Sequence, residues 1–403
     1  MSRRSAFCAV IGGLLVAASA GAHTRSVSYS SWNLDDTGAT VRVRIPLLEL
    51  SRLSLDPTLD VGSGGRAAIY LAERLSLFVG DERCTSSEAP VAEAAPRGWA
   101  HFRWRARCTT SGTPSIESAL FREVAPSHMH FARTDVPGGG VQERVLNRAD
   151  PRWILVSAEA ASGSASSGTT LVGYIGLGIE HILSGWDHLA FVVALLLLAR
   201  RLSEVAGLVT SFTVAHSVTL GLATLGVMRP DGAVVEALIG YSIALVAAEN
   251  GWLLAGRGRS IPGIAAGGTI VLAALAVGGV GRVPPLTYVG LALFAACHFA
   301  LLDRVERPAR LRVAVAFAFG LVHGFGFAGV LAELELPTER LAAALFGFNV
   351  GVELGQLAIV VAVWPALYAL ARHSPARGYP AIAQAGSAAI CGLGLFWFLS
   401  RAW

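Results

Sequence analysis

The chain is poor in charge and contains no lysine. Charged residues make up 15% of its 403 positions, hydrophobic residues make up 53%, and all 32 basic residues are arginines. The mean hydropathy of +0.55 is well above that of ordinary soluble domains. No basic stripe with interleaved aromatic residues is present, which argues against nucleic-acid binding. The composition instead indicates a chain that lies largely within a membrane.

Cysteine and methionine are also scarce, with five and three residues. Cys84 and Cys108 lie in a segment that we expect to be exported, where oxidation is permitted, so we expect them to form a disulfide. Cys297 and Cys391 fall in apolar runs, where a packing role is expected.

The first 22 residues are typical of a secretory signal peptide. Arg3 and Arg4 form a charged start, an apolar run follows, and Ala20-Gly21-Ala22 fits an A-x-A cleavage site. An uncleaved anchor is the alternative. Cleavage after Ala22 would leave His23 at the N-terminus of an exported segment.

Residues 23–156 are expected to form a β-rich exported domain. The stretch "TVRVRIPL" alternates strictly, and "HFRWRARC" places Phe102, Trp104, Ala106 and Cys108 on one face with arginines on the other. A short helix is expected through "RAAIYLAERL", and a sandwich is the default arrangement of the strands. Residues 157–170, rich in Ser, Gly and Ala, are expected to form a flexible linker.

Residues 171–403 predict a transmembrane helical bundle. Eight apolar segments approach the ~20 residues that cross a bilayer: 171–200, 205–227, 233–255, 261–280, 284–302, 311–332, 341–371 and 380–401. The Gly-rich fourth segment is the weakest candidate, and the first and seventh are long enough to need tilt, a break or projection. The predicted fold class is a polytopic α-helical membrane protein, with seven to eight transmembrane helices and an N-terminal β-rich exported domain.

The distribution of arginine predicts the orientation of the bundle. If the β-rich domain is outside, the loops placed outside contain three arginines, Arg229, Arg282 and Arg340. The loops placed inside contain Arg200, Arg201, Arg257, Arg259, Arg304, Arg307, Arg310, Arg312, Arg372 and Arg377. By the positive-inside rule, this asymmetry agrees with the signal peptide and predicts an inner-membrane protein with a periplasmic N-terminal domain.

Ionisable side chains recur inside the apolar spans. A carboxylate at a helix centre costs about 2.5–3.5 kcal/mol on insertion scales, whereas a leucine returns only about 0.3–0.6 kcal/mol. In the first span, "GIEHILSGWDHLAFVVALLLL", the polar residues share one face. Histidine, carboxylate and amide groups with almost no Met or thiolate suit Ni²⁺, Co²⁺, Zn²⁺ or Fe²⁺ rather than Cu(I). The expected metal ligands are His181, Asp187, His188, His216, His323, Asn349 and Glu353, with a secondary path through Glu180, Glu249, His298 and Gln356.

The spacing in the first span leaves two arrangements open. His181 and His188 are seven residues apart, which is about 10 Å along an ideal helix. They can share one ion only if the helix breaks at Ser184-Gly185. Otherwise they form two successive stations. Outside the membrane, "SHMHF" places His128 and His130 on one side of a strand, where they could capture metal together with His23; ordinary surface histidines are the alternative.

Several of these motifs together resemble one family. "HILSGWDH" fits an H-x5-D-H signature, and "FTVAHSVTL", "AAEN", "FGLVHGFGFAG" and "FNVGVELGQ" follow in order, so the likeness covers most of residues 171–371. The sequence is similar to the HupE/UreJ family, nickel permease-like accessory proteins of hydrogenases and ureases. The resemblance implies passage of Ni²⁺, with Co²⁺ as the second choice, and essential roles for His181, Asp187 and His188. The metal would be a substrate rather than a prosthetic group, and a metalloenzyme maturation system is the protein partner that the resemblance suggests.

A metal-dependent intramembrane hydrolase is the alternative, since His/Asp clusters can hold a catalytic Zn²⁺ and its water. An enzyme needs one closed cluster near a membrane face, whereas a permease needs stations strung through the bilayer, which the positions above favour. We therefore expect a transporter and not an enzyme. The sequence lacks a G-x-S-x-G nucleophile motif, which argues against a serine hydrolase. It also lacks a nucleotide-binding signature, so transport would be passive or ion-coupled. An interaction protein acting through its exported domain would leave the buried acids unexplained.

Overall fold

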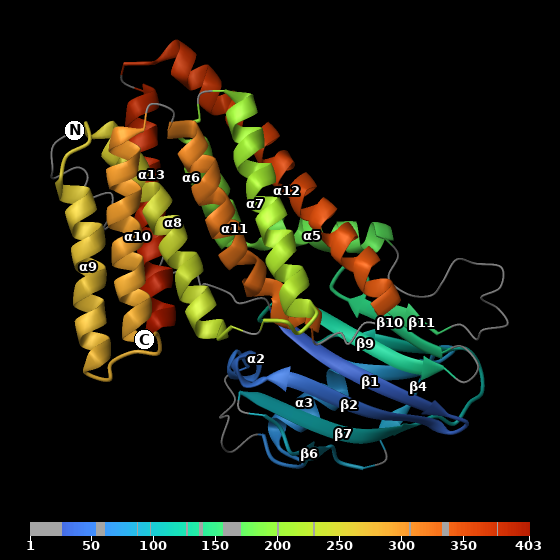
Figure 1. Ribbon diagram of the computed structural model, residues 1–403. Helices are drawn as coiled ribbons and strands as arrows, with labels where there is room; N and C mark the ends of the chain where they lie inside the picture. The colour runs from blue at the N-terminus through green and yellow to red at the C-terminus, as the bar shows by residue number, and fades with distance from the viewer. Residues whose placement is uncertain are drawn as a thin grey trace. The chain divides into compact units, whose positions relative to one another are not determined.

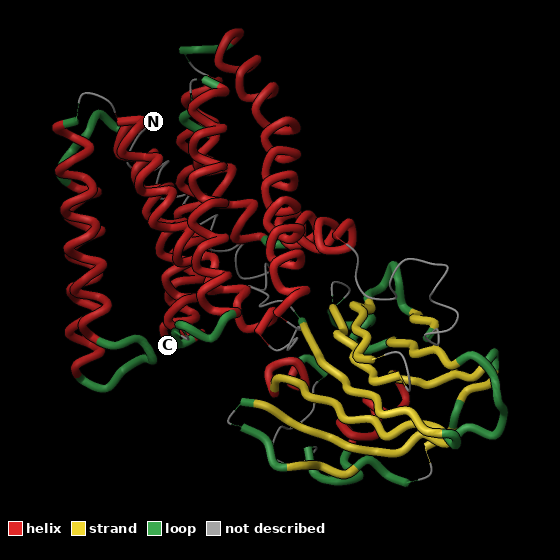
Figure 2. The backbone as a smooth tube through the Cα atoms, turned by 45° about the vertical axis from the view of Figure 1, so that its right-hand side comes forward, coloured by secondary structure: helices red, strands yellow, loops and turns green. Residues whose placement is uncertain are grey.

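The computed structural model describes residues 26–53, 61–86, 88–96, 98–125, 128–136, 140–155, 171–199, 201–228, 230–305, 308–332, 338–376 and 378–403. The expected signal peptide, His23 and the expected linker lie outside these residues. The chain divides into two compact units with a boundary between Val172 and Gly173. Each unit is described by itself (Figures 1 and 2).

The N-terminal unit is built mainly from two β-sheets. The larger has the order β10 (Gly140–Leu146), β9 (Met129–Val136), β1 (Val27–Asp35), β2 (Gly38–Pro46), β7 (Trp99–Arg107) and β5 (Thr85–Ser86), with β6 (Val91–Glu93) also paired to β7. The smaller has the order β11 (Arg152–Ile154), β8 (Pro114–Ser118), β3 (Leu75–Val79) and β4 (Glu82–Arg83). Two short helices, α2 (Leu47–Ser51) and α3 (Arg66–Arg74), accompany the strands. The pairing of β1 with β9 is parallel, whereas β1 and β2 are antiparallel.

Strict alternation in the sequence produces the core of this unit. Val41, Val43 and Ile45 of β2 are fully buried, whereas Arg42 between them is exposed. Phe102 and Trp104 of β7 contribute to the same core, which residues from both sheets and α3 share. Cys84 and Cys108 form a disulfide. The β-rich character of this region is therefore confirmed.

The C-terminal unit is helical. Its helices are α5 (Leu171–Ser184), α6 (Trp186–Leu196), α7 (Leu202–Thr224), α8 (Gly232–Leu254), α9 (Ser260–Val277), α10 (Pro285–Arg304), α11 (Pro308–Ala332), α12 (Thr338–His373) and α13 (Gly378–Ala402). Among the described residues, seven helices are long and apolar enough to cross a membrane, and the pair α5–α6 adds a span bent by 71°. The prediction of a multi-pass membrane protein is confirmed, but the first span is not one continuous helix. Figure 1 shows α5 running across the direction of α7 and α12.

Glycine brings the helices of the bundle into close contact. A Cβ on Gly324 of α11 would lie 2.4 Å from the carbonyl oxygen of His216 on α7. A Cβ on Gly351 of α12 would lie 2.1 Å from the carbonyl oxygen of Ile175 on α5. These contacts exclude any larger residue, and they set the spacing of the helices that carry the candidate site.

Candidate metal site

The break between α5 and α6 bends the first span by 71°. Gly185 separates the two helices in an extended conformation (φ −82°, ψ 99°). The bend brings the ring centroids of His181 and His188 to 4.6 Å, compared with about 10 Å along a straight helix. The structure therefore has the arrangement in which both histidines can share one ion.

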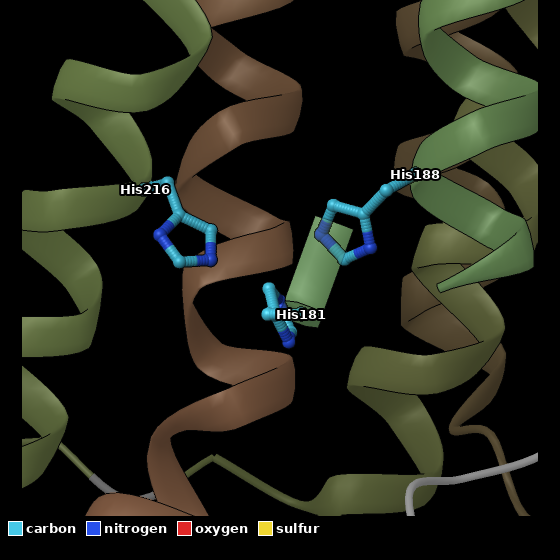
Figure 3. Close-up of side chains that lie close together, drawn as sticks. All are labelled: His181, His188 and His216. Carbon is cyan, nitrogen blue, oxygen red and sulfur yellow. The ribbon is translucent and has the colours of Figure 1, made fainter. Parts of the chain in front are cut away.

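His216 of α7 joins these two histidines. The nitrogen ligand atoms of His181, His188 and His216 lie within 4.8 Å of one another, and all three side chains are buried. Figure 3 shows the three imidazoles grouped around a common centre. Nitrogens bound to one ion through bonds of ~2.0–2.1 Å lie at most about 4 Å apart, so small rotations suffice for joint coordination. We call these three residues the histidine cluster.

Hydrogen bonds fix which nitrogen two of the neighbouring imidazoles present. Nδ1 of His188 lies 2.9 Å from Oδ1 of Asp187, and Nδ1 of His323 lies 2.9 Å from the carbonyl oxygen of Phe319. Both partners are acceptors, so both Nδ1 atoms carry the proton. Nε2 of each ring is buried and has no hydrogen-bond partner among the described residues. A carboxylate or carbonyl that holds Nδ1–H while Nε2 faces a site is the usual outer-shell arrangement of metal-binding histidines.

His216 follows the same pattern through an amide. Its Nδ1 lies 3.3 Å from Oδ1 of Asn349, and the amide is oriented because Nδ2 of Asn349 donates to the carbonyl oxygen of Leu345 at 2.8 Å. Nε2 of His216 is also buried without a hydrogen-bond partner in the described part of the chain. Asp187 and Asn349, both predicted as ligands, thus orient two histidines of the cluster in this structure.

The walls around the cluster are aromatic. His323 of α11 lies beside the cluster, with its ring centroid 5.4 Å from that of His188. Phe212 packs against His323 at 5.0 Å, and Phe348 packs against His181 at 5.2 Å. An ion held here would exchange its hydration shell for imidazole nitrogens in an apolar chamber.

Three other predicted residues lie elsewhere in the bundle. Glu353 accepts a hydrogen bond from Thr210 at 2.8 Å, and Gln356 accepts one from Thr213 at 2.9 Å. Both pairs link α12 to α7. Glu180 is half-buried on α5 and is not among the residues whose ligand atoms converge.

The predicted secondary path is lined by Arg312, a residue that we expected in a loop. Glu249 and His298 are buried as predicted, but Nε of Arg312 lies 2.9 Å from Oε1 of Glu249. Arg312 is itself 5% exposed and lies inside α11, so its assignment to a cytoplasmic loop is wrong. Glu249 also contacts Nε2 of His298 at 2.9 Å, so both carboxylate oxygens have partners. This acid is neutralised by the protein and does not form an open metal station in this state.

The two histidines of the β-rich unit, His128 and His130, also differ from expectation. His128 is 5% exposed and His130 is fully buried, and serine hydroxyls hold all four ring nitrogens at 2.6–2.8 Å. Burial lowers the pKa of His130 to about 3 and holds the pKa of His128 well below its usual value. No nitrogen of either ring is left for an external ion, so this geometry does not support metal capture at the pair.

The fold and the site define a multi-pass membrane protein with a buried histidine cluster formed by a broken span and the helix α7. A model of the family described as HupE / UreJ protein matches residues 157–280 and 260–401, which together make up more than half of the chain. The chain belongs to the HupE/UreJ family, a transporter-like membrane family associated with nickel and cobalt transport. A search of curated proteins found no match.

Proposed function

We propose that the protein moves a divalent transition-metal cation across the inner membrane through the histidine cluster, with Ni²⁺ as the first substrate and Co²⁺ as the second. The observation that carries this proposal is the convergence of His181 and His188, from the broken first span, with His216 of α7. Imidazole nitrogen suits Ni²⁺, Co²⁺ and Zn²⁺, and the family is associated with the first two metals. The lipid bilayer and the cation are the partners, and the cation is cargo rather than a prosthetic group.

The residues divide the work in this proposal. The three imidazoles replace water in the first coordination sphere of the ion, and the carboxylate of Asp187 holds His188 in the required tautomer. The same carboxylate provides negative charge beside the site, which offsets part of the charge of a dehydrated ion. In this proposal the N-terminal unit faces the periplasm. Without Arg312, nine arginines are still assigned to the inner loops and three to the outer loops, which agrees with the positive-inside rule.

Metal accumulation in cells tests the proposal. The chain is expressed in a host that lacks its own nickel uptake, and trace Ni²⁺, Co²⁺ and Zn²⁺ are supplied separately. We expect accumulation of one metal, reduced to the empty-vector level by Asp187→Ala and by His188→Ala at matched membrane abundance. His373→Ala, which removes an exposed imidazole at the end of α12, is the matched control and should accumulate metal normally. No accumulation of any metal above the empty-vector level would exclude import, and export would then be the direction of transport to measure.

One observation favours a second function. Three histidines are also the protein ligand set of some catalytic zinc sites, in which water takes the fourth position. An intramembrane Zn²⁺-dependent hydrolase would bind Zn²⁺ at the cluster and cleave a substrate without accumulating metal in the cell. Hydrolysis by the purified protein, lost in His188→Ala, would identify this alternative.

A further inference from the structure

The buried ion pair of Arg312 and Glu249 has no role in the histidine cluster. Arg312 is 5% exposed, Glu249 is 2% exposed and His298 is 3% exposed. Replacing such a pair by well-packed apolar residues is often neutral or stabilising, so its presence is weak support for a purely structural role.

Arg312 lies between two acids at different depths. Its Nε is 2.9 Å from the deeply buried Glu249, and its Nη1 is 3.8 Å from Oε1 of Glu204, whose side chain is 19% exposed. Glu204 stands in the first turn of α7, at the end of the bundle where α11 begins. The guanidinium therefore has two anionic partners: Glu249 on its inner side and Glu204 towards the helix end.

The same group is tied to the short helix that carries His188. Oδ1 of Asn250 lies 3.4 Å from Nη2 of Arg312, and Nδ2 of Asn250 donates to the carbonyl oxygen of Ala194 at 2.7 Å. This carbonyl belongs to the last turn of α6, where backbone acceptors lack partners within the helix. His188 precedes Ala194 by six residues, which is about 9 Å along the helix. Movement of Arg312 would therefore remove the hydrogen bond to the Asn250 side chain, whose amide holds one end of the helix that carries His188.

We propose that Arg312 is a gate for the cation path. In the state seen here its guanidinium occupies Glu249 and closes the path on this side of the histidine cluster. In the open state the guanidinium leaves Glu249 and pairs with Glu204 alone, and the cation leaving the cluster takes its place between Glu249 and His298. Nε2 of His298 faces Oε2 of Glu249 at 2.9 Å, so it is the nitrogen that would meet an ion held between the two residues. The two cations exclude one another at Glu249 because like charges repel strongly at low dielectric. This proposal rests on the proposed function, since it assigns the gate of the same path.

The first test changes the acid that would receive the gate. Purified full-length Glu204→Gln is compared with the wild type for equilibrium Ni²⁺ binding and for downhill Ni²⁺ flux in proteoliposomes containing a metal-sensitive dye. We expect binding within two-fold of the wild type and flux at least ten-fold slower. The matched control is Asp303→Asn, an exposed acid at the end of α10 that should leave both values unchanged. Flux at the wild-type rate in Glu204→Gln would overturn the gate.

The second test does not depend on transport. Arg312→Gln alone leaves a buried carboxylate unpaired and can fail to fold, so the charge-balanced double variant Arg312→Gln/Glu249→Gln is used. Hydrogen exchange is measured in the last turn of α6 and the first turns of α11, with and without Ni²⁺. We expect at least ten-fold faster exchange than in the wild type without metal, and no further change when Ni²⁺ is added. Unchanged exchange in the double variant would overturn the gate even if transport is established. Increased exchange in a protein that moves no metal would retain a conformational lock and reject the proposed function.

Discussion

Replacing Gly185 by alanine is expected to weaken Ni²⁺ binding by roughly 10–100-fold or more, the loss typical of disturbed outer-shell contacts in metal sites. A Cβ at this position would lie 2.9 Å from Nδ1 of His188 and 3.1 Å from Oδ1 of Asp187, which are the two atoms of the hydrogen bond that orients His188. It would also lie 2.9 Å from the carbonyl oxygen of His181. Alanine in addition favours a continuous helix, in which His181 and His188 move apart.

Isothermal titration of the purified protein with Ni²⁺ measures this effect. Gly176→Ala is the matched control, because a Cβ at Gly176 of α5 would meet nothing within 4 Å. The two variants make the same chemical change in the same span and differ in what the new methyl group contacts. Equal thermal unfolding curves would show that the bundle is intact in both. Wild-type affinity in Gly185→Ala would mean that the break between α5 and α6 does not create the metal site.

The sequence contained all three residues of the histidine cluster but not their geometry. Insertion costs identify His181, His188 and His216 as residues with a function inside the membrane, because lipid-facing helices rarely carry them. The same argument does not decide whether the first span bends. Gly185 permits a break, but the position of α5 after the bend is set by its contacts with α12, where Gly351 lies against Ile175. These contacts join segments more than 150 residues apart in the sequence.

Arg312 was missed for an electrostatic reason. It follows several loop arginines, and counting charge near helix ends places all of them in the cytoplasm. Its burial is possible because Glu249 and Asn250, about 60 residues earlier, meet it inside the bundle. A pattern within one helix does not contain that information.

The N-terminal unit contains a hydrogen-bonded chain of serines and histidines that the sequence did not predict. Ser26 directly precedes β1, and Ser28 and Ser30 follow at alternate positions of that strand. His128 directly precedes β9, and His130 is two residues further on. The two strands are about 100 residues apart and pair in parallel, with Ser28 opposite His130. We call these five residues the Ser–His ladder. Period-two serines and period-two histidines would have predicted it only if the pairing of the two strands had been known.

The ladder has one consistent direction. Nε1–H of Trp32 donates to Ser30 at 2.7 Å, and at the other end the hydroxyl of Ser26 donates to the carboxylate of Glu49. Between these ends each hydroxyl can accept one hydrogen bond and donate one, so both histidines carry their proton on Nδ1. Every polar atom is satisfied only while the two imidazoles are neutral. A second proton on either ring would face a hydroxyl that is already donating to it.

Replacing Ser28 by alanine is therefore expected to destabilise the N-terminal unit by several kcal/mol. The change leaves Nε2 of His128 and Nδ1–H of His130 without their common partner, and each unsatisfied buried group costs about 1–3 kcal/mol. Hydrogen exchange of β1 and β9 in the full-length protein measures the loss. Ser31→Ala, at an exposed position of the same strand, should have little effect.

Acid should destabilise the same unit in the wild type. The pKa of His130 falls from an unfolded value of 6.5 to about 3 because of burial, and that of His128 falls in the same direction. Below about pH 6.5 the histidines bind protons in the unfolded chain but not in the folded ladder. The free energy of unfolding therefore decreases as the pH is lowered towards 3. The limiting slope is about 1.4 kcal/mol per pH unit for each histidine. Burial raises the pKa of Glu49, which acts in the opposite direction, but one carboxyl opposes two imidazoles. Exchange of β1 and β9, corrected for intrinsic rates, should thus show constant stability above pH 7 and a steep loss between pH 6 and 4. A flat profile through that range would show that the histidines are charged in the folded state and that the ladder is not the hydrogen-bonded chain described here.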